Sequence, residues 1–145
     1  MDKAPKGQVE LEKIVMEMLL FGDDPILEQL REQYKNTTIE SRKFNGVGFF
    51  TNYVIDKKIP PLGGITRMIF GDVYADFGEL EKLGFIVFIS NGYLSTLEGF
   101  SHIDKWPEDV TGIEPYYVWN YGGLLKRKDT RDFNAVIQEI QKRSP

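Results

Sequence analysis

The sequence has 145 residues, of which 41% are hydrophobic and 13% aromatic, and these values are typical of a globular domain that can bury a core of its own. It contains no cysteine, which excludes disulfides, thiolate catalysis and cysteine-ligated metal sites. The net charge of −4 and the pI of about 5.1 argue against a dedicated nucleic-acid-binding protein, because such proteins carry a basic face.

Two amphipathic helices are predicted in the N-terminal third of the chain. Apolar residues recur at helical spacing over residues 11–19, and Gly22 can adopt the left-handed conformation that ends a helix. Asp24 can then cap a second helix, in which Pro25 suits the first turn and helical spacing continues to Tyr34. The segment is therefore predicted to be two helices joined by a tight corner.

The hydrophobic period changes to that of β-strands from about residue 39. Alternate residues over 47–55 share one face of a strand. The proline- and glycine-rich segment 60–64 predicts a loop, because proline cannot donate to a strand ladder. Residues 65–77 are predicted to be a second long strand, in which Gly71 marks a bulge.

The strongest local signal is a β-hairpin. Residues 84–90 are an apolar run, which predicts a strand that is covered on both faces. Asn91 and Gly92 are the preferred pair for a type I′ turn, and residues 93–97 are predicted to return antiparallel to the first strand.

The C-terminal third is predicted to be a long loop, one strand and one helix. Residues 101–115 show no sustained period and predict the loop, whereas aromatic residues mark a strand at 116–121. The basic stretch 126–128 is interpreted as a solvated linker, and Asp129 can cap a final helix. The apolar residues on the core face of that helix are Phe133, Val136, Ile137 and Ile140.

The order of these elements predicts a single α+β domain over residues 1–145. Sequential strands joined by short turns favour a mainly antiparallel sheet of about five to six strands. Two N-terminal helices and one C-terminal helix are expected to pack on one face of that sheet.

One histidine and its acidic neighbours are the first candidate for chemistry. His102 lies close in sequence to Glu98 and Asp104, and a histidine–carboxylate pair can act as a general base or a metal ligand. A metal site usually needs three or more ligands, and no metal-binding spacing occurs here. We therefore favour a loop histidine that bonds the backbone, and we expect neither a metal nor a cofactor.

Two further patterns give weaker indications. Asp72 and Asp76 fall on one face of a predicted strand, but their α-carbons would be about 13 Å apart, which is too far for a tight carboxylate pair unless a bulge bends the chain. Solvent-exposed acids are therefore favoured.

The glycines of residues 46–49 precede a strand, whereas a phosphate-binding loop precedes a helix. No Walker lysine, dinucleotide fingerprint or nucleophile elbow is found in the sequence.

Aromatic residues near the C-terminal end are the most informative candidates for binding. Tyr117, Trp119 and Tyr121 alternate on the last predicted strand and so share one face, and Trp106 lies in the loop before them. Large amphipathic aromatics are favoured at binding hot spots but are equally ordinary core residues, so both interpretations stay open. The acidic residues that would form a polar rim are Asp104, Glu108, Asp109 and Glu114.

Several segments together carry a family resemblance. They are LFGDDP (20–25), GVGFFT (46–51), FGDV (70–73), GFIVF (84–88), NGYL (91–94), LEGF (97–100) and WP (106–107). Over roughly residues 18–108 the chain resembles a family of small uncharacterised bacterial proteins. The resemblance implies a bacterial cytoplasmic origin and a single-domain unit, and it transfers no catalytic residue. In architecture alone the chain is also similar to small immunity and regulator domains of the SMI1/KNR4 kind.

The leading hypothesis is a non-enzymatic protein-binding module, in an immunity or regulatory setting, that recognises another protein through the aromatic residues. The alternative hypothesis is a small-ligand binder or hydrolase. Its pocket would be built from Glu98, His102, Asp72 and Asp104. A third hypothesis is homodimerisation through an edge of the sheet.

The cellular location follows from signals that are missing in the sequence. The N-terminal residues lack the apolar core of a signal peptide, and no apolar run approaches the roughly 20 residues that span a bilayer. We therefore expect a cytoplasmic protein with neither a membrane nor a nucleic acid as its partner.

Overall fold

The computed structural model describes residues 4–102, 104–121 and 124–137. Its named elements are α1 (Gln8–Leu19), α2 (Pro25–Lys35), β1 (Thr37–Phe44), β2 (Gly48–Ile55), β3 (Arg67–Phe77), β4 (Glu81–Ser90), β5 (Tyr93–Ser101), β6 (Tyr116–Tyr121) and β7 (Leu124–Lys128). A last helix begins at residue 133 and is described as far as residue 137. Within the described residues, no helix is long and apolar enough to cross a lipid bilayer.

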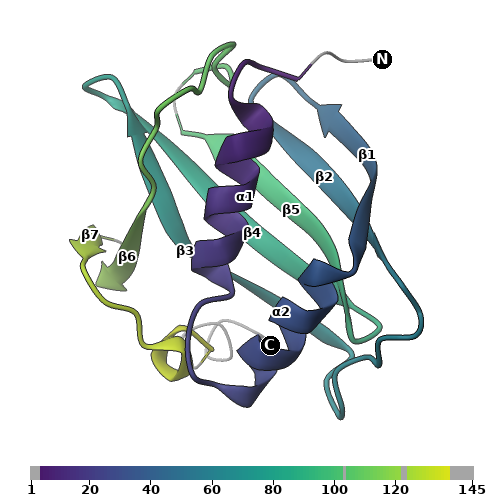
Figure 1. Ribbon diagram of the computed structural model, residues 1–145. Helices are drawn as coiled ribbons and strands as arrows, with labels where there is room; N and C mark the ends of the chain where they lie inside the picture. The colour runs from purple at the N-terminus through teal and green to yellow at the C-terminus, as the bar shows by residue number, and fades with distance from the viewer. Residues whose placement is uncertain (1–3, 103, 122–123, 138–145) are drawn as a thin grey trace.

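The seven strands form one sheet in the order β1-β2-β5-β4-β3-β6-β7. Every neighbouring pair in the sheet is antiparallel. The sheet curves, and α1 and α2 lie across the same side of it (Figure 1). The predicted α+β class, the antiparallel sheet and the order of helices and strands are confirmed, with slightly more strands than the five to six that were predicted.

The prediction of a solvated linker at residues 126–128 is wrong. These residues belong to β7, which pairs with β6 and forms one edge of the sheet. Lysine and arginine are common on edge strands, where their charge discourages pairing with another chain. A short charged strand shows little hydrophobic alternation, and its sequence therefore has the composition of a linker.

Aspartates cap the starts of α2 and of the last helix. Asp24 accepts a hydrogen bond from the amide two residues further on at 2.8 Å, so α2 begins as predicted. The predicted cap of the last helix is wrong, because that helix begins at residue 133, four residues after Asp129. Asp132 takes the role instead, and its carboxylate accepts a hydrogen bond from the Ala135 amide at 3.2 Å.

One hydrophobic core fills the space between the helices and the sheet. Its buried side chains include Leu11, Val15 and Leu19 of α1, Leu27 and Leu30 of α2, and Phe49, Phe85, Val87 and Leu97 of the sheet. Phe133 and Val136 of the last helix are also buried, and Ile137 packs against the core, as predicted. Ile140 lies outside the described residues.

The predicted hairpin is confirmed between β4 and β5. Asn91 and Gly92 have φ angles of 54° and 80°, which are the left-handed conformations that a type I′ turn requires. Gln33 of α2 fixes this turn, because its amide donates to the Gly92 carbonyl and accepts from the Leu94 amide, both at 2.9 Å. The turn is therefore held to the helical layer as well as by its own sequence.

The predicted bulge in β3 is confirmed by a shift of register between Phe70 and Val73, on either side of Gly71. The extra residue inverts the alternation of side chains along the strand. Asp72 is consequently buried, whereas Asp76 is exposed. The prediction that these two carboxylates share one exposed face is therefore wrong.

Candidate functional site

Trp106 belongs to the core. Its side chain is 7% exposed, and its ring centroid lies 5.0 Å from that of Phe49 and 6.0 Å from that of Phe85. The indole N–H donates to Gln8 Oε1 at 3.0 Å. Of the two interpretations left open for this residue, core side chain or contact surface, the structure favours the core side chain.

Hydrogen bonds link Trp106, through Gln8, to Glu12 and Arg42. The Gln8 amide donates to Glu12 at 2.7 Å, and the Arg42 guanidinium holds both Glu12 oxygens at 2.7 and 2.9 Å. Burial, with a smaller contribution from the Glu12 charge, raises the pKa of the Tyr53 phenol. Trp106, Gln8, Glu12 and Arg42 are thus bound to one another, so their role is structural.

The aromatic row on β6 is only partly free to make contacts. Tyr117 is half-buried, and its hydroxyl donates to the Met18 carbonyl at 2.7 Å. Burial raises the pKa of this phenol. Trp119 is also half-buried, with the Lys128 ammonium 5.6 Å from its ring centroid. The side chain of Tyr121 lies outside the described residues.

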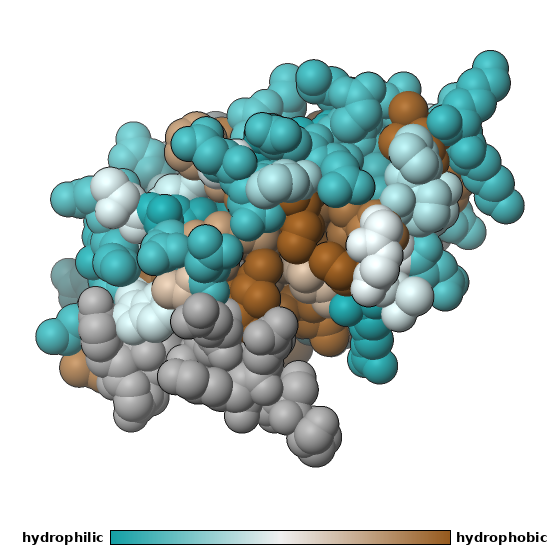
Figure 2. All heavy atoms as spheres, turned by 90° about the horizontal axis from the view of Figure 1, so that it is seen from below, coloured by the Kyte–Doolittle hydropathy of each residue, from teal (hydrophilic) through white to brown (hydrophobic). Residues whose placement is uncertain are grey.

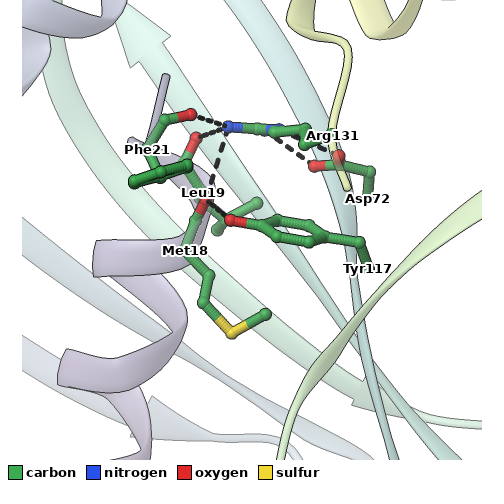
Figure 3. Close-up of polar contacts among 6 residues, drawn as sticks. All are labelled: Met18, Leu19, Phe21, Asp72, Tyr117 and Arg131. Atoms are coloured by element: carbon green, nitrogen blue, oxygen red, sulfur yellow. Dashed lines mark hydrogen bonds and ion pairs between the residues drawn. The ribbon is translucent and has the colours of Figure 1, made fainter. Parts of the chain in front are cut away.

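Asp72 forms a buried ion pair with Arg131, which precedes the last helix. Two guanidinium nitrogens lie 2.7 and 2.9 Å from the two carboxylate oxygens, and the side chains are 8% and 2% exposed. Figure 3 shows Arg131 between Asp72 on one side and backbone carbonyls at the end of α1 on the other. Both oxygens of Asp72 are thus occupied, so this carboxylate is not available as a general base.

The same guanidinium caps the C-terminal end of α1. It donates to the carbonyls of Leu19 and, at 3.1 Å, Phe21 (Figure 3). The last carbonyls of a helix have no partner within the helix and carry a partial negative charge, which a cation stabilises. Arg131 therefore joins β3, the end of α1 and the C-terminal segment into one structural latch.

His102 and Asp104 are organised by Glu81 of β4. The two carboxylate oxygens of Glu81 accept from the backbone amides of His102 at 2.7 Å and of Asp104 at 2.8 Å. The imidazole stacks on Phe100 with a centroid distance of 5.4 Å and meets the edge of Tyr74 at 5.6 Å. In the described residues, no group of three or more histidine, aspartate or glutamate side chains is arranged to hold a metal ion.

The side of the sheet opposite α1 and α2 carries no helix among the described residues, and we call it the open face. Its central side chains are Phe50 of β2, Ile69 of β3, Ile86 and Phe88 of β4, and Glu98 and Phe100 of β5. All six are half-buried. The apolar run of β4 was predicted to be covered on both faces, and in the described chain only its inner face is fully covered.

Glu98 lies in the middle of the open face. Phe50 and Ile86 are its direct cross-strand partners, so the three side chains stand in one row with β-carbons about 5 Å apart. Within the described part of the chain, the carboxylate makes no hydrogen bond and no ion pair. Burial raises its pKa above the usual value of a glutamate.

A hollow of about 520 Å³ lies on the open face, and Phe50, the cross-strand neighbour of Glu98, is part of its lining. Phe50, Ile69 and Phe88 supply its apolar lining, and Lys43 and Arg67 flank it from β1 and β3. These two strands are four positions apart in the sheet, or roughly 19 Å. Neither cation forms an ion pair with a described residue.

A second hollow, of about 530 Å³, lies at the corner between α1 and α2. Figure 2 shows the lower end of the molecule, where apolar side chains gather between polar ones. The hollow is lined by Leu20, Phe21 and Tyr34, and its Arg31 donates to the carbonyls of Leu20 and Gly22. Its arginine is therefore already used as a helix cap, whereas Lys13 and Lys35 also line the hollow.

The predicted site residues are not brought into one place. Glu98 and His102 lie on the open face, Asp104 lies in the loop that follows it, and Asp72 is bound on the helical side of the sheet. Sequence reasoning missed Phe50, Ile86 and Phe88 as surface residues, although the apolar run of β4 pointed to a second covered face.

No protein-family model matches the chain, and the searches of curated proteins and of solved structures gave no significant match.

Proposed function

We propose that this protein is a non-enzymatic protein-binding module and that the open face is its binding surface. The observation that carries the proposal is the outer side of β4 and β5, where Ile86, Phe88 and Phe100 are half-buried around the unpaired Glu98. Sheets whose strands are apolar on both faces are normally covered on both. A contiguous apolar patch with a polar rim is typical of a protein interaction site.

The alternative of a hydrolase or small-ligand pocket receives less support. Of its four proposed polar groups, Asp72 is bound to Arg131 and the backbone at His102 and Asp104 is held by Glu81. A small-molecule site usually buries most of its ligand among convergent polar groups. The hollow on the open face is instead a broad depression on a sheet, which suits a second macromolecule.

The biological setting that we propose is immunity or regulation in a bacterial cytoplasm. It rests on the likeness in architecture, two helices followed by an antiparallel sheet, to small immunity and regulator domains. The gene neighbourhood tests this part of the proposal: an adjacent toxin gene supports it, and a conserved neighbourhood of metabolic genes contradicts it.

The binding surface is tested by comparing variants on the two sides of the sheet. Ile86→Thr changes the open face and keeps a β-branched residue in the strand, whereas Phe21→Ser changes an apolar side chain that is 66% exposed next to α1. Tagged wild-type and variant proteins are used to capture partners from native lysate, after circular dichroism has confirmed that each is folded.

We expect Ile86→Thr to lose the partner that the wild type captures and Phe21→Ser to retain it. Loss of the partner in Phe21→Ser, with retention in Ile86→Thr, would move the binding surface to the helical side. Light scattering on the purified wild type tests the hypothesis of homodimerisation. A stable homodimer would make a second copy of the chain the occupant of this surface.

A further inference from the structure

We infer that the partner inserts an arginine side chain over Glu98, in the row between Phe50 and Ile86. This inference rests on the proposed function, because it names the chemistry of the partner at the open face. It follows from three features of the structure: the position of Glu98 in the sheet, the absence of a counter-ion for it among the described residues, and the nature of the side chains around it.

The position of Glu98 makes it the centre of an apolar frame. Its direct cross-strand neighbours are Phe50 and Ile86, and Phe100 lies two residues further along the same strand and so on the same face. The Phe100 ring lies over Gly84 of β4, where a β-carbon would be only 2.3 Å from the ring. The glycine thus leaves room for this aromatic ring on the open face.

No described residue forms an ion pair with Glu98. Lys43 stands in the same row on β1, but Phe50 separates it from Glu98, and Arg67 lies on β3 at the far side of the hollow. Lys82 lies four residues before Ile86 on β4 and is paired with Asp76. Tyr74 and His102 both contact Phe100, and the imidazole stacks on its ring. A partly desolvated carboxylate without a partner is unfavourable, so a cation from outside would stabilise it.

The surrounding side chains favour arginine over lysine. A guanidinium is planar, weakly hydrated and able to stack on aromatic rings while it bonds both oxygens of a carboxylate. Phe50 supplies an aromatic surface in the same row and Glu98 the carboxylate. An ammonium ion is strongly hydrated and would lose more on entering the same apolar frame.

Lys43 and Arg67 indicate the charge around that arginine. Both cations flank the apolar lining and lack an ion pair within the described residues, so they suit acidic groups of the partner at its rim. Rim charges of this kind mainly accelerate association and fix the orientation of the partner. The expected complement of the open face is therefore a central arginine among apolar side chains with acidic residues outside them.

The test uses three short blocked peptides as probes. One has the sequence leucine-arginine-leucine, the second replaces arginine by its neutral isostere citrulline, and the third replaces it by aspartate. Binding is followed by NMR through the side-chain carboxyl resonances of carbon-13-labelled glutamate, which detects weak complexes up to millimolar dissociation constants. The proteins compared are the wild type, Glu98→Gln and the control Glu10→Gln, whose exposed glutamate lies on α1.

We expect the arginine peptide to shift the Glu98 resonance and to bind the wild type about threefold to fivefold more tightly than the citrulline peptide. Glu98→Gln should abolish this preference, and Glu10→Gln should keep it. The inference is overturned by any of four results. The arginine and citrulline peptides bind equally, or the preference for arginine survives in Glu98→Gln. Alternatively, the aspartate peptide binds more strongly than the arginine peptide, or no resonance shifts at millimolar peptide. If capture from lysate still depends on Ile86, the proposed function stands while the arginine inference fails.

Discussion

Replacing Arg131 by methionine removes a charge from the latch among β3, α1 and the C-terminal segment. The guanidinium is 2% exposed and bonds both oxygens of Asp72. It also caps the carbonyls of Leu19 and Phe21. The substitution leaves a buried carboxylate without a counter-ion and a helix end without a cap.

We expect Arg131→Met to lower the free energy of unfolding by about 3–5 kcal/mol, the usual cost of breaking one side of a buried ion pair. For a domain of this length, that corresponds to a fall in melting temperature of about 10–20 °C. Urea unfolding followed by circular dichroism measures the change, with thermal melts as a second readout.

Two comparisons make this prediction specific. Lys82→Met breaks the ion pair with Asp76, whose side chains are 47% and 54% exposed, and should cost less than about 1 kcal/mol. The double variant Asp72→Leu with Arg131→Met removes both charges and should be less destabilised than the sum of its single variants. If Arg131→Met costs no more than Lys82→Met, the latch does not hold the fold as described.

Four further predictions concern single residues. Glu98→Gln should stabilise the protein at neutral pH but not in acid, because burial raises the pKa of Glu98 in the folded state. The folded wild type therefore loses stability as the pH rises above 4.5 and through the folded pKa. Unfolding at several pH values should show a difference in unfolding free energy between variant and wild type of under about 1 kcal/mol, which vanishes at low pH. Thr51→Val should raise the unfolding free energy by about 1 kcal/mol, because the buried hydroxyl of Thr51 finds no partner among the described residues, and an unchanged or lower urea midpoint would contradict this. Gln33→Ala should cost about 2–3 kcal/mol, since it leaves the Gly92 carbonyl and the Leu94 amide without their side-chain partner, and a cost near zero would show that the turn does not need α2. Trp106→Phe should lower the unfolding free energy by about 1–3 kcal/mol, because it leaves Gln8 Oε1 unpaired in the core. Partner capture should persist in this variant. Loss of capture with an intact fold would show that Trp106 belongs to the binding surface.

The parts of the fold that the sequence predicted are those with local physical causes. Asp24 caps α2 through an amide two residues away, and Asn91 and Gly92 form their turn because their own backbones accept positive φ angles. Gly71 marked its bulge because the residue has no side chain, and a β-carbon there would lie 2.3 Å from the Phe85 carbonyl oxygen. In each of these cases the determining contact is short in sequence or needs only one residue type.

The parts that the sequence did not predict depend on contacts between distant residues. Arg131 reads as an ordinary surface charge, and its partner Asp72 lies 59 positions away. Trp106 reaches Gln8 across 98 positions, so no local pattern separates a core tryptophan from a binding one. The alternation in β3 gave the wrong face for Asp72, because one extra residue at the bulge inverts it.

The open face was predicted only in part. The apolar run that became β4 predicted a strand covered on both sides, and the six half-buried residues of the open face show where the described chain leaves that second side uncovered. The sequence predicted Glu98 only as one polar group of a pocket shared with His102, Asp72 and Asp104. The central place of Glu98 on the open face depends on the strand order, in which β2 and β4 lie on either side of β5.

The most direct measurement of the central claim is methyl NMR of isoleucine-labelled protein with and without the captured partner. Ile69 and Ile86 report from the open face, and Ile14, which is 43% exposed on α1, reports from the helical side. The open face as binding surface predicts that the methyl signals of Ile69 and Ile86 shift or broaden while that of Ile14 stays unchanged. A change at Ile14 with Ile69 and Ile86 unaffected would contradict it.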